Sequence, residues 1–226
     1  PMLEQIRGKL VVSCQALADE PLHSSFVMGR MALAAKKGGA AAIRAQGVSD
    51  ILEIRRVTGL PVIGLIKRRQ EDSPVYITPT AREVTELLAT PCEMVALDAT
   101  HWRRSGEAAE LMARIHGAGR LALADVATYE EGLEAVKAGA DAVSTALAGY
   151  TEDSPLTPGP DLALVERLVA ALPVPVLAEG RIASPEDLRR AMAAGAWAAV
   201  VGSAITRPQL ITAEFARALM PPETRL

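Results

Sequence analysis

The stretch Pro61-Val-Ile-Gly-Leu-Ile-Lys67 places a lysine directly after a short apolar run that a proline opens. A short apolar run bounded by a turn residue is typical of a strand that is buried on both faces of a parallel sheet. Parallel strands are joined by crossover connections that usually contain a helix. The stretch therefore predicts an α/β fold in which Lys67 lies where a strand leaves the core.

A unit made of a helix, a Gly-Ala step and a short apolar strand recurs along the chain. It occurs over residues 38–43 before Arg44, over residues 137–145 and over residues 193–202. Glycine directly after a helix is the usual left-handed cap. The recurrence predicts one repeated βα building block.

Eight apolar runs are predicted as strands, at residues 9–14, 40–43, 61–67, 94–97, 121–124, 142–145, 174–178 and 198–202. Predicted helices lie at about 23–37, 49–57, 80–88, 106–116 and 128–137, then up to 171, from 184 onward and over 209–219. Two helix starts carry clear caps, a Thr80-Ala-Arg-Glu83 capping box and Ser184-Pro185. A short additional strand is expected at 75–77, over the mouth of the sheet.

Eight βα units without a linker predict a single (β/α)8 TIM barrel, one domain covering residues 1–226. The alternative is a doubly wound open sheet. That fold usually carries a glycine-rich dinucleotide turn after its first strand, where this chain has Ser13-Cys-Gln15. The barrel is therefore favoured.

Net charge and cysteine content limit the classes of binding partner and the cellular compartments that are consistent with the sequence. The net charge is −3 and the chain has no basic block, which argues against nucleic-acid binding. Cys14 and Cys92 show neither metal-ligand nor CxxC spacing, which favours a reducing cytoplasm. We expect no signal peptide and no membrane span.

Polar residues or glycines follow the predicted strands, and a barrel brings all strand ends to one rim. They are Gln15, Arg44, Lys67, Asp98, Asp125, Thr145, Glu179 and Gly202-Ser203. One polar strand end carries little information, but a full set predicts a site for polar recognition or catalysis.

Lys67 and Glu179 are the pair that suggests chemistry. The pKa of a free lysine is about 10.4, too high for a base at neutral pH. Burial and a neighbouring cation such as Arg44 would lower it. Lys67 and Glu179 could form a structural ion pair or a proton-transfer pair. The two interpretations overlap, because an ion pair of this kind is also positioned for acid–base catalysis.

The loops after the last two strands are predicted to bind phosphate. Gly180 with Arg181, and Gly202 with Ser203, stand where this fold often presents backbone N–H groups to a phosphate. The alternative is that the glycines only make tight turns.

We expect no metal and no organic cofactor. His101 and His116 lack partners at metal-ligand spacing. Asp98 and Asp125 could bind Mg²⁺, but strand-end carboxylates are common in barrels.

Motifs spread over nearly the whole chain carry a family resemblance. They are Ser13-Cys-Gln15, Pro21-Leu-His-Ser-Ser25, Gly38-Gly-Ala40, Ile43-Arg-Ala45, Pro61-Val-Ile-Gly64, Ile66-Lys-Arg68, Ala96-Leu-Asp-Ala-Thr100, Ala124-Asp125, Gly149-Tyr-Thr151, Ala178-Glu-Gly180 and Gly202-Ser-Ala-Ile-Thr-Arg-Pro208. In this order the chain resembles the bacterial N-acetylmannosamine-6-phosphate 2-epimerases.

The resemblance implies interconversion of N-acetylmannosamine 6-phosphate and N-acetylglucosamine 6-phosphate in sialic acid catabolism. It implies Lys67 as the residue that acts on the C2 proton and Glu179 as the second acid–base residue. The substrate-binding positions it implies are Gln15, Arg44, Asp125 and Arg207, and its phosphate loops match Gly180 and Gly202-Ser203. The chain departs from the family pattern at residues 101–105 and 152–160, both of which are expected at the rim.

Two other functions stay open at this point: a lyase that forms a Schiff base on Lys67, and a sugar-phosphate sensor without turnover. A metal-dependent pentulose-phosphate 3-epimerase is disfavoured, because no strand ends in histidine. The final helix carries an apolar stripe that suits either the core or a dimer face, and we expect a homodimer.

Overall fold

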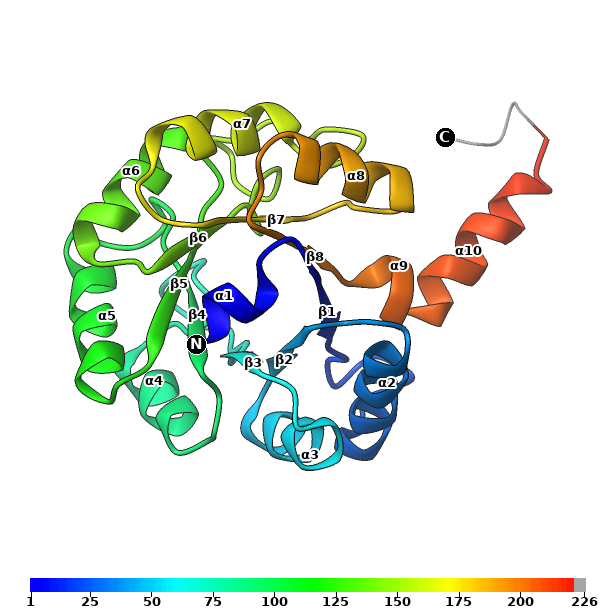
Figure 1. Ribbon diagram of the computed structural model, residues 1–226, viewed down its shortest axis with the longest axis horizontal. Helices are drawn as coiled ribbons and strands as arrows, with labels where there is room; N and C mark the ends of the chain where they lie inside the picture. The colour runs from blue at the N-terminus through cyan, green and yellow to red at the C-terminus, as the bar shows by residue number, and fades with distance from the viewer. Residues whose placement is uncertain (222–226) are drawn as a thin grey trace.

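The computed structural model describes residues 1–221, and within them eight parallel strands close into a barrel in the order of the chain (Figure 1). The strands are β1 (Leu10–Cys14), β2 (Ala42–Gln46), β3 (Val62–Leu65), β4 (Met94–Asp98), β5 (Leu121–Asp125), β6 (Ala142–Ser144), β7 (Val176–Glu179) and β8 (Ala198–Val201). β1 pairs with β8 as well as with β2, which closes the sheet. The predicted (β/α)8 barrel is confirmed.

Helices surround the barrel (Figure 1). They are α2 (Ser25–Lys37), α3 (Val48–Thr58), α4 (Ala81–Leu88), α5 (Glu107–Gly117), α6 (Tyr129–Ala138), α7 (Leu162–Ala171), α8 (Pro185–Ala193) and α10 (Pro208–Ala218). The two predicted caps are confirmed. Thr80 and Glu83 form the capping box of α4, and the Ser184 side chain accepts a hydrogen bond from the backbone N–H of Asp187.

Two short helices were not predicted, α1 (Met2–Ile6) and α9 (Ser203–Thr206). Helices this short show no apolar periodicity that a sequence pattern could reveal. α1 lies across the barrel opening, and its Met2 and Ile6 side chains are buried against residues inside the barrel (Figure 1). It therefore closes the end of the barrel opposite the strand exits.

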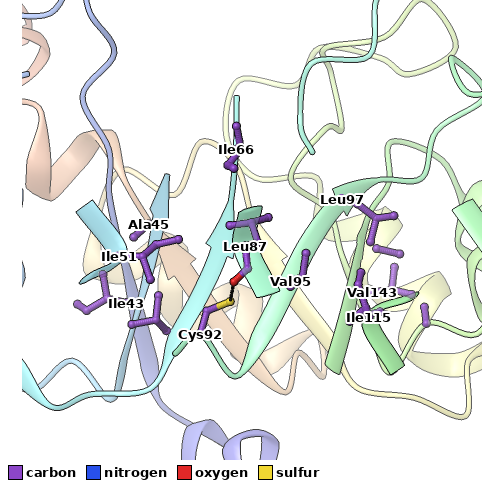
Figure 2. Packing of buried hydrophobic residues seen from close by; sticks show 14 of the residues in the cluster. Ile43, Ala45, Ile51, Ile66, Leu87, Cys92, Val95, Leu97, Ile115 and Val143 are labelled. Atoms are coloured by element: carbon purple, nitrogen blue, oxygen red, sulfur yellow. Dashed lines mark hydrogen bonds between the residues drawn. The ribbon is translucent and has the colours of Figure 1, made fainter. Parts of the chain in front are cut away.

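Alternation along the strands builds two apolar layers. Side chains that point inward, such as Ala42, Ile63 and Leu123, fill the barrel interior together with α1. Side chains that point outward, such as Ile43 and Val95, pack beneath the helices (Figure 2).

The same alternation corrects the predicted end of the second strand. The sequence placed Arg44 at a strand exit, but β2 continues to Gln46. Arg44 follows Ala42 on the inward face, and its side chain is 2% exposed. A cation therefore lies inside the barrel, directly above its apolar filling.

The segment Val75–Ile77, which we call the strap, lies where an additional strand was expected, but it forms no regular strand. It makes an isolated antiparallel bridge between Lys67 and Ile77. The backbone N–H of Arg68 also donates to the carbonyl of Tyr76 at 2.9 Å. The strap thus holds the residues beyond β3 in place at the rim. Among the helices of residues 1–221, none combines the length and apolar character that a transmembrane span requires.

Candidate active site

A cavity of about 740 Å³ opens at the strand exits. Nine of the ten residues predicted for the site line it, namely Gln15, Arg44, Lys67, Glu179, Gly180, Arg181, Gly202, Ser203 and Arg207. The tenth, Asp125, has no exposed surface and lies against Arg44 instead. The convergence of strand ends that the barrel predicts is therefore present.

Arg44 is held by two carboxylates. Its Nη1 and Nη2 donate to Oδ1 and Oδ2 of Asp125 at 3.0 and 2.6 Å. Its Nη1 also lies 3.2 Å from Oε2 of Glu179. Bidentate pairing of this kind fixes the guanidinium plane as well as its charge. Asp125 thus positions Arg44 from below the cavity, and its predicted contact with substrate remains a prediction.

Glu179 ends β7, and residues of the neighbouring strand hold it. Ser144 Oγ donates to Oε2 of Glu179 at 3.4 Å. Thr145 Oγ1 donates to the Glu179 carbonyl at 2.9 Å and accepts from its backbone N–H at 3.0 Å. Burial raises the pKa of Glu179, and the charge of Arg44 opposes that shift. The carboxyl group is therefore more easily protonated than an ordinary glutamate.

Lys67 lies two residues beyond β3, and its backbone N–H donates to Oε1 of Gln46 at 3.1 Å. Burial and then the nearby Arg44 lower its pKa from 10.5 to about 8, while Glu179 opposes the shift. This is the effect that the sequence predicted from burial and a neighbouring cation. Near physiological pH the neutral fraction of the amine is thus far larger than in an ordinary lysine, while the protonated form still predominates.

Lys67 and Glu179 face the same cavity without forming an ion pair. Within residues 1–221, the cation paired with Glu179 is Arg44, and no ion pair joins Glu179 to Lys67. The structural ion pair considered from the sequence is therefore wrong. The reason is that Arg44 lies deeper in the barrel than expected, and its guanidinium group occupies the position next to the Glu179 carboxylate.

Two buried polar atoms of cavity residues lack a hydrogen-bond partner among residues 1–221. They are Oε1 of Gln15 and Nε of Arg44. The other end of the Gln15 side chain donates to Ser13 Oγ at 2.9 Å. Buried polar atoms are normally satisfied, so both atoms suit contacts with a polar substrate.

Arg181 follows β7 and Arg207 lies beyond the neighbouring β8, and the two side chains make different contacts. Arg207 Nε donates to Oε1 of Glu20 at 2.7 Å, which ties the start of α10 to the loop after β1. Arg181 Nε and Nη1 donate to the carbonyls of Gly159 and Ala148 at 3.1 and 2.8 Å. The Arg181 side chain thus supports the loop between β6 and α7.

The predicted phosphate contact of the Gly180–Arg181 segment therefore depends on backbone N–H groups. Both residues have positive φ, 105° for Gly180 and 55° for Arg181. Consecutive residues in unusual conformations turn their N–H groups toward a common point in many anion sites.

Sequence reasoning missed three residues that help to form the site: Gln46, Tyr76 and Glu20. Gln46 carries a usable signal, since it continues the inward alternation of Ala42 and Arg44. Tyr76 and Glu20 lie in irregular segments that carry no periodic signal.

The loops that depart from the family pattern contact each other. Trp102 Nε1 donates to Oε2 of Glu152 at 3.0 Å, which joins the loop after β4 to the loop after β6. In the first of these loops, Arg103 is buried and donates to the carbonyls of Thr78 and Pro79 at 2.7 and 2.8 Å. Both loops lie at the rim, as expected, and Arg103 helps to fix the base of the strap.

The fold and the site define a (β/α)8-barrel protein with a lysine, a carboxyl group and a buried arginine gathered at the strand ends. Such a combination of side chains is typical of barrel enzymes that catalyse proton transfer. The chain belongs to the N-acetylmannosamine-6-phosphate epimerase family. The family model described as "Putative N-acetylmannosamine-6-phosphate epimerase" matches residues 28–220.

Individual relatives agree over nearly their whole length. A protein of Clostridium perfringens strain 13 named "Putative N-acetylmannosamine-6-phosphate 2-epimerase" is 60% identical over 216 residues, 95% of this chain and 98% of the relative. A protein of the same name from Clostridioides difficile strain 630 is 56% identical over 220 residues, 96% of this chain and 99% of the relative.

Solved structures agree with the fold. The N-acetylmannosamine-6-phosphate 2-epimerase of Clostridium perfringens superposes with a TM-score of 0.95 at 58% identity, covering 97% of this chain and 96% of that chain. A thiamine phosphate pyrophosphorylase of Pyrococcus furiosus superposes with a TM-score of 0.63 at 21% identity, covering 91% of this chain and 90% of that chain. The second similarity extends to the fold alone.

Substituting Asp125 tests the buried pair. We expect Asp125→Ala to lower the free energy of unfolding by about 3–5 kcal/mol, because it removes the bidentate partner of a buried charge. Denaturant unfolding measures this. The matched control is Glu186→Ala, which breaks the exposed Glu186–Arg189 pair and is expected to leave stability nearly unchanged. Equal effects of the two substitutions would contradict the structural role of Asp125.

Proposed function

We propose that this chain interconverts N-acetyl-D-mannosamine 6-phosphate and N-acetyl-D-glucosamine 6-phosphate by removing and returning the proton on C2. The observation that carries the proposal is a lysine whose pKa is lowered to about 8, in one cavity with Glu179 and Arg44. Membership of the epimerase family supports the same reaction. We place the reaction in the catabolism of sialic acid and other amino sugars.

The reacting form of the sugar is the open chain. The C2 proton of an acylamino sugar is acidic enough to be removed only when C1 is an aldehyde, because the carbonyl accepts the electron pair. Removal of the proton gives an enediolate-like intermediate with negative charge on O1. Hydrogen-bond donors aimed at this oxygen lower the barrier. Arg44 and Gln15, which line the cavity, are the candidates for this support.

Lys67 and Glu179 carry the two proton transfers. The neutral amine of Lys67 takes the C2 proton and becomes an ammonium group. A proton returns to the other face of C2, directly or indirectly, from Glu179, which becomes a carboxylate. The raised pKa of Glu179 favours the protonated form that this step requires. The two groups exchange roles when the reaction runs in the opposite direction.

Removing the base tests the reaction. We expect Lys67→Ala to lower kcat by at least about 10²-fold, the scale of general base catalysis. A coupled assay with N-acetylmannosamine 6-phosphate measures kcat, and EDTA is expected to leave the wild-type rate unchanged. Lys37→Ala, on the exposed surface of α2, is the control.

A second measurement follows solvent hydrogen. Turnover in D₂O is expected to introduce deuterium at C2, and borohydride is expected to trap no adduct on Lys67. Turnover without deuterium uptake, or a Lys67→Ala variant with near-normal kcat, would refute proton transfer by Lys67.

The pH dependence follows from the lowered pKa of Lys67. Below about pH 8 the amine is mostly protonated and cannot accept the C2 proton. We therefore expect the profile of log(kcat/KM) against pH to show an apparent pKa of about 8 that belongs to Lys67. At high pH the rate is expected to fall, because Glu179 then lacks the proton that it returns to C2. The profile is measured above pH 6.5, because the substrate phosphate itself titrates near pH 6. A rise centred near 10.5, the ordinary lysine value, would contradict the effect of burial and Arg44.

We propose that the chain forms a homodimer through α10. None of the residues of α10 is buried, and the helix extends away from the barrel (Figure 1). Leu210 and Phe215 expose 44% and 77% of their surface. An apolar helix face left uncovered in this way suits burial against a second copy.

Light scattering tests the dimer. We expect the purified protein to have the mass of two chains, and Phe215→Glu to shift it toward one chain, because a charge would have to be buried. Phe26→Glu, at an exposed aromatic residue of α2, is the matched control and is expected to leave the mass unchanged. A wild-type protein with the mass of a single chain would refute the proposal.

We propose that the enzyme acts in the cytoplasm. Its substrate would be a phosphate monoester with a charge near −2, which does not cross a lipid bilayer unaided. The enzyme would therefore share the compartment in which its substrate is formed.

A further inference from the structure

The middle residue of the strap faces the cavity. Val75 and Ile77 are buried, with 2% and 3% of their surface exposed, whereas Tyr76 between them is only partly buried. Both Tyr76 and Ile77 line the cavity. The strap is bound to the segment that carries the base. Its backbone pairs with Lys67 through Ile77, and Arg68 N–H donates to the Tyr76 carbonyl at 2.9 Å. Tyr76 is therefore held beside Lys67.

The base of the strap is anchored to β4 and to the residue that follows β3. Thr78 has a φ of 46°, a conformation that is unusual for a β-branched residue. Its Oγ1 donates to the carbonyl of Ala96 in β4 at 2.6 Å and accepts from the N–H of Ile66 at 3.3 Å. Its carbonyl accepts from Arg103 at 2.7 Å. These contacts hold a strained residue in place, so the strap is a firm support for Tyr76.

The Tyr76 hydroxyl is available to a ligand. No residue among 1–221 forms a hydrogen bond with it, although tyrosine hydroxyls usually find a partner when their rings are largely covered. Burial raises the pKa of Tyr76, and the charge of nearby Asp125 adds to that shift. The group therefore stays a neutral O–H and keeps its donor function over the working pH range.

The carboxylates around Arg44 reduce the positive charge that it can offer to a substrate oxyanion, so a second hydrogen-bond donor is useful in the cavity. Asp125 takes both terminal nitrogens of Arg44, and Glu179 contacts Nη1 as well. A guanidinium paired in this way has much of its charge compensated before substrate arrives. A neutral donor in the same cavity can stabilise a new oxyanion and, unlike Arg44, is not already paired with a carboxylate.

We propose that Tyr76 is a catalytic residue, whose phenolic O–H donates a hydrogen bond to the substrate oxygen that gains negative charge when the C2 proton leaves. The proposal rests on the proposed epimerase function. In this proposal Arg44 and Tyr76 together stabilise the intermediate. Arg44 contributes a positive charge, and Tyr76 contributes a hydrogen bond from a group that is not paired with a carboxylate.

The test is Tyr76→Phe, which keeps the ring and removes only the hydroxyl. A hydrogen bond made only in the transition state lowers kcat and kcat/KM equally, so KM should not change. We expect kcat to fall about 10²-fold, the scale of losing one oxyanion donor. Deuterium uptake at C2 in D₂O should fall by the same factor. Each rate is referred to folded protein measured by near-UV circular dichroism, so that partial unfolding cannot imitate the effect.

The matched control is Tyr129→Phe on α6, outside the cavity, with kcat and KM expected to stay at wild-type values. A Tyr76→Phe variant within twofold of wild-type kcat, or one changed in KM alone, would overturn the role of Tyr76 and leave the epimerase function standing. A wild-type protein that leaves both sugar phosphates unchanged would overturn the epimerase function and this role together.

Discussion

The guanidinium of Arg44 lies inside the barrel, where an isolated charge would be too costly to bury without partners. Asp125 and Glu179 supply these partners from two other strands, so the pairing joins three strands at the level where the apolar filling ends. The same cation lies close enough to Lys67 to help lower its pKa. One buried charge therefore sets the position of one carboxyl group and the protonation of the base.

Placing this charge depends on the two ends of the barrel being different. At one end α1 adds Met2 and Ile6 to a dry interior of alanine and larger aliphatic side chains. At the other end the inward positions turn polar, with Ser144, Asp98 and Asp125 following aliphatic residues on their strands. Polar side chains at this end can form hydrogen bonds with groups at neighbouring strand ends, with loop hydroxyl groups and with a ligand in the cavity. The chemistry is thus confined to the rim at the strand exits.

Loops that are far apart in the sequence complete the rim by contacting one another. Arg207 reaches Glu20, and Trp102 reaches Glu152. Arg103 clamps the carbonyl of Thr78 beneath the strap. Each contact ties a rim loop to another loop or to the start of a helix, so the cavity has firm walls although irregular segments form most of its edge. This firmness is what allows single side chains such as Tyr76 to be aimed at a substrate.

The repeated βα unit, the caps of α4 and α8 and the polar strand ends were enough to predict the barrel and several residues of its cavity, because periodicity and turn chemistry are local properties. Arg207 followed only from the family resemblance. The pairing of Arg44 with Glu179, rather than of Lys67 with Glu179, was decided only by the tertiary structure. It depends on β2 running two residues past Arg44, and strand ends are set by pairing with neighbours. Glu20 and Tyr76 likewise acquire their places from contacts across the rim, for which no local pattern exists.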